Sequence, residues 1–339
     1  MNVLLFKPGA IGDMLQLSPV VRAIKERLPE ARIALMTGDA ASAELYAHNP
    51  LVDEILVFDR KGEHRSWRAF LKLWAEVRRR RFDLVVNYQR SNLKGWLLTS
   101  AALPCRLVVY RKARSRVVHA VENHLEAVAP LGIDPRAADR RLELPLGAEA
   151  VRWAGELLER EGLAGRPAAA LVLGASHPVN RWPAGRFAEL AGRLDAELGV
   201  ASILVGGPQD RELADAVTAA PGGARVVDLA GRASLQQTGA MLARCAVAVS
   251  GDTGPMHMAA AVGTPVVALF GAADPARTGP VGEGHRVLQA REVPCVPCRS
   301  RVCRHTPYLE CMERITVDAV FEAVKGILRG DKGPEPPAL

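Results

Sequence analysis

Short apolar runs that end in glycine or polar loops recur along the whole chain, and they constrain its fold more than any other feature. The first run, 3–6, leads into a loop with Gly9 and Gly12, after which apolar residues recur at helical spacing. Such alternation is typical of parallel sheets wrapped by helices. The pattern predicts further strands at 32–36, 54–58, 84–87, 107–110, 169–173, 201–205, 225–228, 247–250 and 266–270.

The length of 339 residues accommodates two α/β domains, each with its own core. We predict an N-terminal Rossmann-like domain over 1–160 and a C-terminal Rossmann-like domain over 167–314. A final helix, 315–330, follows and can pack back on the N-terminal domain. The last segment, 331–339, is expected to be a disordered tail.

The apolar runs are far shorter than the roughly 20 residues that cross a bilayer. The first residues show neither a basic leader before an apolar stretch nor a cleavage site after it. We therefore expect a soluble, cytoplasmic protein.

Positive charge is concentrated between residues 60 and 81, which hold nine Lys or Arg residues and two Glu residues. This segment alone matches the formal net charge of +7 of the chain. Its apolar residues recur at helical spacing, which predicts an amphipathic helix that packs on the sheet with a solvated basic face. Nucleic acid, a phosphorylated glycolipid and a membrane surface are all partners that fit the charge.

Residues 250–265 combine a strand end, a glycine-rich polar loop and a helix that starts at Pro255. Backbone N–H groups and the positive end of a helix dipole meet there, which suits a diphosphate. Asp252, Thr253 and Gly254 lie in this loop, and His257 falls in the first helical turn. A helix cap at Thr253 and a structural His257 fit the same spacing equally well.

This segment resembles glycosyltransferase family 9, the heptosyltransferases of lipopolysaccharide core assembly, and is most similar to the second-heptose type. Two other segments share the resemblance, which covers nearly the whole chain: Lys7-Pro8-Gly9-Ala10-Ile11-Gly12-Asp13-Met14-Leu15 and Pro294-Cys295-Val296-Pro297-Cys298. The family implies the GT-B fold, with two facing Rossmann-like domains and a cleft between them. It also implies an acceptor on the first domain, a donor on the second, and inverting transfer of heptose from ADP-heptose.

The resemblance implies that Asp13 is the catalytic base, although the residue type alone favours a helix cap or a first-turn acid. Arg181 stands where the family has a basic residue near the donor phosphates, often Lys. Ser176, in the loop before it, is either a phosphate ligand or a simple polar loop residue. The residues that correspond to the family's nucleoside pocket are Gly206, Gly207, Gln209, Asp210 and Glu212. Any of the last three could bind the ribose.

Four of the six cysteines cluster near the end of the chain, as Cys295, Cys298, Cys303 and Cys311. In a cytoplasmic chain this clustering favours a structural zinc or a reduced loop over disulfides. The sequence has no Asp-x-Asp triplet that could clamp a metal-bound diphosphate. We therefore expect catalysis without a metal or other cofactor.

The prediction is thus an inverting, metal-independent glycosyltransferase with ADP-heptose as donor and an anionic glycolipid as acceptor. We predict that Arg60, Lys61, Arg65 and Arg68 bind the acceptor or another anionic surface. The protein is expected to contact the inner face of the membrane peripherally. Alternatives are another nucleotide sugar or acceptor and a sugar-nucleotide epimerase. A nucleic-acid-binding or redox module is more remote, because it leaves both glycine loops unexplained, so no nucleic-acid partner is expected.

Overall fold

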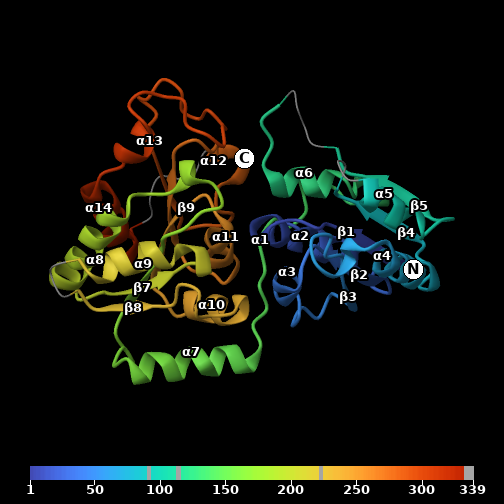
Figure 1. Ribbon diagram of the computed structural model, residues 1–339, viewed down its shortest axis with the longest axis horizontal. Helices are drawn as coiled ribbons and strands as arrows, with labels where there is room; N and C mark the ends of the chain where they lie inside the picture. The colour runs from blue at the N-terminus through green and yellow to red at the C-terminus, as the bar shows by residue number, and fades with distance from the viewer. Residues whose placement is uncertain (90–92, 112–115, 221–223, 332–339) are drawn as a thin grey trace. The chain divides into compact units, whose positions relative to one another are not determined.

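The computed structural model describes residues 1–89, 93–111, 116–220 and 224–331. The chain divides into two compact units, 1–145 and 146–339 (Figure 1). Residues 332–339 of the expected tail lie outside the described residues. In the described part of the chain, helices with the length and apolar character needed to span a membrane are absent.

The first unit is built on a parallel sheet of five strands in the order β3-β2-β1-β4-β5. Every strand predicted in this half is present within one residue of its expected bounds. The strands are β1 (Asn2–Phe6), β2 (Arg32–Thr37), β3 (Glu54–Val57), β4 (Leu84–Asn87) and β5 (Arg106–Val109). The helices are α1 (Ile11–Leu15), α2 (Ser18–Arg27), α3 (Ala40–Glu44), α4 (Trp67–Arg79), α5 (Leu93–Ser100) and α6 (Ala120–Glu126).

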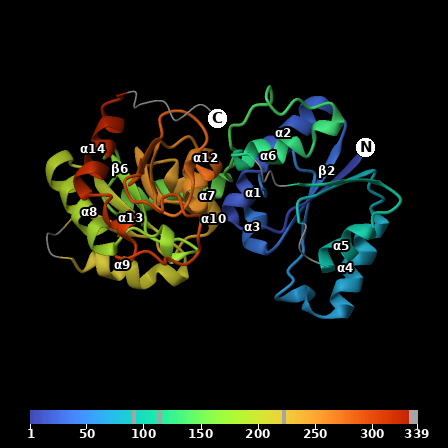
Figure 2. The same ribbon diagram turned by 90° about the horizontal axis from the view of Figure 1, so that it is seen from above.

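Helices cover both faces of this first sheet, with α4 and α5 on one side and α2 and α6 on the other (Figure 2). Ser66 starts α4 by accepting a hydrogen bond from the Ala69 N–H at 3.2 Å. The helix buries Phe70, Leu73 and Val77 against the sheet. The predicted amphipathic helix is therefore confirmed, and its basic face points away from the core.

The second unit contains a parallel sheet of six strands in the order β11-β10-β9-β6-β7-β8. Its strands are β6 (Ala168–Val172), β7 (Ala201–Val205), β8 (Val226–Asp228), β9 (Val247–Gly251), β10 (Val266–Phe270) and β11 (Arg286–Gln289). Its helices are α7 (Ala148–Arg160), α8 (Ala184–Leu198), α9 (Arg211–Thr218), α10 (Leu235–Leu242), α11 (Gly254–Ala261), α12 (Pro275–Thr278), α13 (Glu310–Glu313) and α14 (Val317–Leu328). The edge strand β11 was not predicted.

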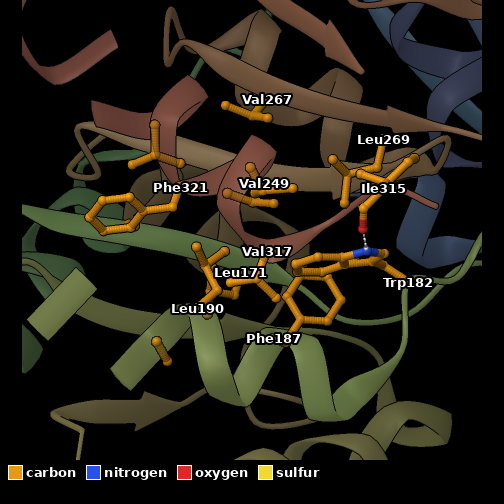
Figure 3. Close-up of a cluster of buried hydrophobic side chains, with 14 of the residues drawn as sticks. Leu171, Trp182, Phe187, Leu190, Val249, Val267, Leu269, Ile315, Val317 and Phe321 are labelled. Carbon is orange, nitrogen blue, oxygen red and sulfur yellow. Dashed lines mark hydrogen bonds between the residues drawn. The ribbon is translucent and has the colours of Figure 1, made fainter. Parts of the chain in front are cut away.

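Trp182 stands at one end of the core of the second unit (Figure 3). Its indole N–H donates to the Ile315 carbonyl at 2.9 Å, and its ring meets that of Phe187 edge-on at 4.9 Å. Phe321 of α14 belongs to the same buried cluster. The sequence analysis allowed the C-terminal helix to pack on the first domain. Its apolar face instead fills the core of the second unit, against α8, β9 and β10.

The division at residue 145 assigns α7 to the second unit, where it packs along α10. The Gly147 N–H donates to the Gln236 side-chain oxygen at 3.0 Å and fixes the start of α7. The sequence-based boundary at residue 160 placed this helix in the first domain, because its helical pattern precedes the loop around Gly165. Packing, rather than loop composition, determines where the helix belongs.

Candidate active site

Each sheet has one position where the strand order reverses, between β1 and β4 in the first unit and between β6 and β9 in the second. Ligands of open parallel sheets bind outside the carboxyl ends of the strands at such positions. The segments that follow three of these strands, β1, β6 and β9, carry Asp13, Arg181 and residues 252–257 respectively. The proposed base and the proposed diphosphate-binding residues therefore follow strands at the reversal of their own sheet, whereas the proposed nucleoside residues follow β7 and the proposed acceptor residues follow β3.

In the first unit, the loop after β1 brings Asp13 to this position. The chain passes Gly9 and begins α1 at Ile11, so Asp13 is an acid in the first helical turn. A β-carbon on Gly9 would lie 3.0 Å from that of Asp13, so glycine leaves room for the carboxylate. Its side chain keeps 51% exposure and is accessible to a substrate.

Lys7, the first residue after β1, links Asp13 to the protein interior. Its Nζ lies 3.3 Å from Asp13 Oδ1 and 3.3 Å from His124 Nε2. The residue is only 8% exposed. The rings of Tyr88 and Tyr110 lie 6.0 and 5.9 Å from the ammonium. The buried ammonium of Lys7 therefore forms an ion pair with the exposed carboxylate of Asp13.

His124, on α6, is the second polar partner of the Lys7 ammonium. Its Nδ1 lies 3.2 Å from the Gln16 carbonyl oxygen, which only accepts hydrogen bonds, so Nδ1 must carry a proton. Burial and, as the second largest cause, the positive charge of Lys7 lower the pKa of His124 to about 3. The ring is therefore neutral near pH 7, and Nε2 accepts a hydrogen bond from Lys7.

The aromatic residues around Lys7 are held by hydrogen bonds of their own. Tyr88 donates to the His124 carbonyl at 3.1 Å, and Tyr110 donates to Asn123 Oδ1 at 3.0 Å. Burial, together with the negative charge of Asp13, raises the pKa of Tyr110 to about 12. Both hydroxyl groups stay protonated, and neither competes with Asp13 as a base at neutral pH.

The neutral, buried His124 predicts that the first unit loses stability in acid. Its pKa in the folded chain lies below the ordinary value of 6.5, so the unfolded chain takes up a proton that the folded chain rejects. The free energy of unfolding should fall as the pH decreases from about 6.5 to about 3. Urea unfolding at a series of pH values measures this slope. His124→Asn should flatten it, and His48→Asn, at an exposed site, should not; equal slopes in all three proteins would contradict the assignment.

In the second unit, the loops after β6 and β9 pack directly on each other. Asn180 Nδ2 donates to the Asp252 carbonyl at 3.3 Å. A β-carbon on Gly251 would lie 2.2 Å from the Asn180 carbonyl oxygen, so only glycine allows this approach. The structure thereby brings Arg181 and the glycine-rich loop to the same end of the sheet, as the sequence analysis expected of a donor site.

Arg181 is held in place by its neighbours. Its Nε and Nη2 donate to the Ala175 carbonyl at 3.0 and 2.9 Å, and Nη2 lies 3.9 Å from Asp210 Oδ1. A β-carbon on Gly174 would lie 2.1 Å from the Asp210 carboxylate. The side chain of Arg181 remains partly exposed, which leaves its outer edge for an anion.

The start of α11 presents the other predicted donor residues. Thr253 is the N-cap residue of α11, as the alternative interpretation expected, but its hydroxyl makes no capping hydrogen bond. Gly254 is the first residue of the helix, and His257 is buried in its first turn. Ser176 is exposed in the loop after β6. Ser176 and Thr253 thus lie in the loops at the carboxyl ends of β6 and β9, and Gly254 and His257 lie in the first turn of α11.

The residues proposed for the nucleoside occupy the loop after β7, the strand next to β6. Gln209 and Glu212 are exposed and can reach a ligand. Asp210 is buried instead, and its Oδ2 accepts from the Gly207 N–H at 2.9 Å and from Gln209 Nε2 at 3.2 Å. Its carboxylate organises this loop and Arg181, which leaves Gln209 and Glu212 as the candidates for a ribose contact.

The four clustered cysteines line one cavity of about 380 Å³, together with Val179, Ala272 and Leu309. Within the residues described, no group of three or more His, Cys, Asp or Glu side chains is arranged to hold a metal ion. Burial raises the pKa of the Cys311 thiol, which disfavours the thiolate that would bind a metal. The interpretation of these cysteines as a zinc site is therefore not supported. The other interpretation, a loop of reduced cysteines, stays a prediction.

Sequence reasoning missed the residues that support Asp13. Lys7 could have been found, because the first residue after a strand at the reversal position is a candidate ligand. His124, Tyr88 and Tyr110 had no such signal, since they come from separate segments that only the fold brings together. The role of Asp210 as a buried support was likewise not visible in its loop.

In comparison with known proteins, the chain is similar to members of one family. A model described as glycosyltransferase family 9 (heptosyltransferase) matches residues 70–309. Lipopolysaccharide heptosyltransferase 1 of Pseudomonas aeruginosa is 28% identical, with 91% of this chain and 88% of that protein covered. Lipopolysaccharide heptosyltransferase 2 of Salmonella typhimurium is 27% identical, with 85% and 88% covered.

Solved structures share the fold over the whole chain. A family 9 glycosyltransferase from Veillonella parvula has a TM-score of 0.85 at 22% identity, with 97% of each chain covered. The ADP-heptose lipopolysaccharide heptosyltransferase II of Escherichia coli has a TM-score of 0.80 at 25% identity, with 98% of this chain and all of that chain covered. The predicted α/β fold class is confirmed.

Proposed function

The chain belongs to glycosyltransferase family 9 and is a glycosyltransferase, and from this premise we propose that it transfers heptose from ADP-heptose to the inner core of lipopolysaccharide. ADP-heptose and lipopolysaccharide are taken from the names of its relatives, and the inner core is what the resemblance of the sequence implies. The observation that carries the proposal is the Lys7–Asp13 pair at the strand-order reversal of the first sheet. This arrangement provides an accessible carboxylate where a parallel sheet binds its ligand.

On the acceptor side, Asp13 is the proposed general base. Its carboxylate takes the proton from the acceptor hydroxyl while the hydroxyl oxygen forms a bond to the anomeric carbon of the donor. Lys7 favours the ionised carboxylate by its charge and fixes its orientation through the 3.3 Å contact. Lys7 acts through Asp13 and is a positioning residue. An epimerase would not need this base, which sets the two functions apart.

On the donor side, the bond between the anomeric carbon and the phosphate oxygen breaks, and its electron pair leaves with ADP. Attack opposite to this leaving group inverts the anomeric centre. Arg181, Thr253, Gly254, His257 and the positive end of α11 are proposed to stabilise the charge that develops on the diphosphate. These groups supply positive potential at the phosphates, and we propose that the reaction proceeds without a divalent metal.

Nucleotide binding tests the donor site without an acceptor. Isothermal calorimetry should show at least about tenfold tighter binding of ADP than of UDP or GDP. Arg181→Ala should weaken ADP binding by about 10- to 100-fold, the usual effect of losing a charged hydrogen bond. Arg232→Ala is the matched control, since Arg232 is exposed in the same unit and pairs with Asp228 at 3.4 Å.

Each other outcome would change the proposal in a defined way. Tighter binding of UDP or GDP would retain the transferase and replace the sugar donor. Absence of binding by all three nucleotides would contradict the donor-site assignment. An equal loss in Arg232→Ala would mean that general charge, rather than the position of Arg181, attracts the nucleotide.

A further inference from the structure

Four large apolar side chains of the first unit are exposed on two neighbouring helices. On α4, Trp67 is 58% exposed and Leu71 is 57% exposed; on α5, Leu93 is 75% exposed and Leu97 is 39% exposed. Each pair is spaced by four residues, so each lies along one side of its helix. Single exposed apolar residues are ordinary, but a group of four across two helices marks an interaction surface.

The two helices form a continuous surface, because α4 and α5 lie side by side (Figures 1 and 2). Lys94, at the start of α5, places its Nζ 5.0 Å from the centre of the Trp67 ring. The same group donates to the Arg65 carbonyl at 2.9 Å. These contacts join the beginnings of the two helices, and we call the surface of Trp67, Leu71, Leu93 and Leu97 the α4–α5 face.

Exposed cations precede α4 in the chain and continue along it. They lie in the loop after β3 and along α4, and none of them makes an ion pair with a residue that the structure describes: Arg60, Lys61, Arg65, Arg68 and Lys72. Arg80, at the far end of the basic segment, behaves differently and pairs with Glu54 at 2.6 Å. The charge that faces solvent beside the apolar residues therefore lacks an acidic partner within the described chain.

The position of the face in the fold relates it to the candidate active site. Helices that connect parallel strands start at the carboxyl edge of the sheet, so Trp67 and Leu93 lie toward that edge. Asp13 lies at the same edge of the same sheet. A planar partner bound to the α4–α5 face would therefore approach the edge that carries the proposed base.

We propose that the α4–α5 face docks on the surface of a lipid bilayer with anionic headgroups. The apolar side chains enter the boundary between headgroups and acyl chains, and the cations meet the headgroup phosphates. A nucleic acid would use the cations but leave Leu71, Leu93 and Leu97 unused. A second copy of the chain would bring two positive faces together. Lipid binding is independent of the reaction; only its purpose, access to a membrane-bound acceptor, rests on the proposed function.

Vesicle co-sedimentation tests this face with the full chain and with neither donor nor acceptor present. The vesicles contain about 30% phosphatidylglycerol in phosphatidylcholine, and pure phosphatidylcholine is the reference. The test variant is Leu71→Ser with Lys72→Gln on α4. Its matched control is Val151→Ser with Arg152→Gln on α7, where the same two kinds of side chain are also exposed.

We expect the unaltered chain to bind the anionic vesicles and the α4 variant to lose at least about tenfold in partition coefficient, of which the lysine contributes about fivefold. The α7 control should remain within about twofold. Brominated lipid should quench fluorescence of the unaltered chain more than that of Trp67→Phe.

Three results would overturn the inference: failure to bind anionic vesicles, equal binding to phosphatidylcholine alone, or an equal loss in the α7 control. Displacement of the protein by millimolar inorganic phosphate would also overturn it, because the cations would then form a phosphate site rather than a lipid-docking face. ADP binding by the same preparations separates this outcome from failure of the proposed function.

Discussion

Replacing Asp13 by asparagine is expected to lower kcat by about 10²- to 10⁴-fold, the usual contribution of a general base. The change keeps the size of the side chain but removes its ability to take a proton. The dissociation constant for ADP should stay unchanged, because the proposed donor residues lie in the second unit. Steady-state kinetics and calorimetry on the same preparation measure both quantities.

Two variants control this prediction. Glu30→Gln makes the same chemical change at an exposed carboxylate of the first unit and should leave kcat unaltered. Lys7→Met removes the positive charge that favours an ionised Asp13, so the acid limb of the kcat/KM profile should move to higher pH. Full activity of Asp13→Asn would remove the base assignment and favour a function, such as epimerisation, that does not need it.

Replacing Trp182 by alanine is expected to lower the free energy of unfolding by about 3–5 kcal/mol. The side chain is buried in the core of the second unit, so its removal leaves a cavity beside Phe187. Urea unfolding followed by circular dichroism measures the loss. Because Trp182 follows Arg181 directly, weaker ADP binding should accompany it.

Trp182→Phe separates packing from hydrogen bonding. Phenylalanine keeps an aromatic ring next to Phe187 but cannot donate to the Ile315 carbonyl. That carbonyl retains the Arg186 Nη1 donor at 2.6 Å, so this substitution should cost only about 1 kcal/mol. Equal losses for the alanine and phenylalanine variants would show that the hydrogen bond, rather than the filled volume, stabilises the core.

The parallel sheets could be predicted because their central strands are continuous apolar runs that end in glycine loops. The edge strand β11 could not, because its four residues, Arg286 to Gln289, hold only two apolar side chains and are half buried. The apolar pattern of α14 likewise did not predict which domain the helix packs on. An apolar stripe shows that a helix is buried, but it does not show which sheet it covers.

Some residues of the candidate site could likewise be predicted from the sequence, and others could not. The 252–257 loop was found from its own glycine motif, whereas Asp13 and Arg181 were assigned only through the family resemblance of the segments that hold them. The environment of Lys7 could not be predicted, since His124 is 117 residues away in the sequence and contributes through a single contact. Likewise, the burial of Asp210 depends on Gly174, a residue of another loop that gives its carboxylate space.

The direct test of the central claim is transfer itself. The purified chain is incubated with ADP-heptose and a lipopolysaccharide core that ends at the heptose acceptor, and the product is analysed by mass spectrometry. The account predicts that the core gains one heptosyl unit for each ADP released, and that Asp13→Asn slows both changes by about 10²- to 10⁴-fold. No gain with ADP-heptose, together with transfer from a UDP- or GDP-sugar, would contradict it.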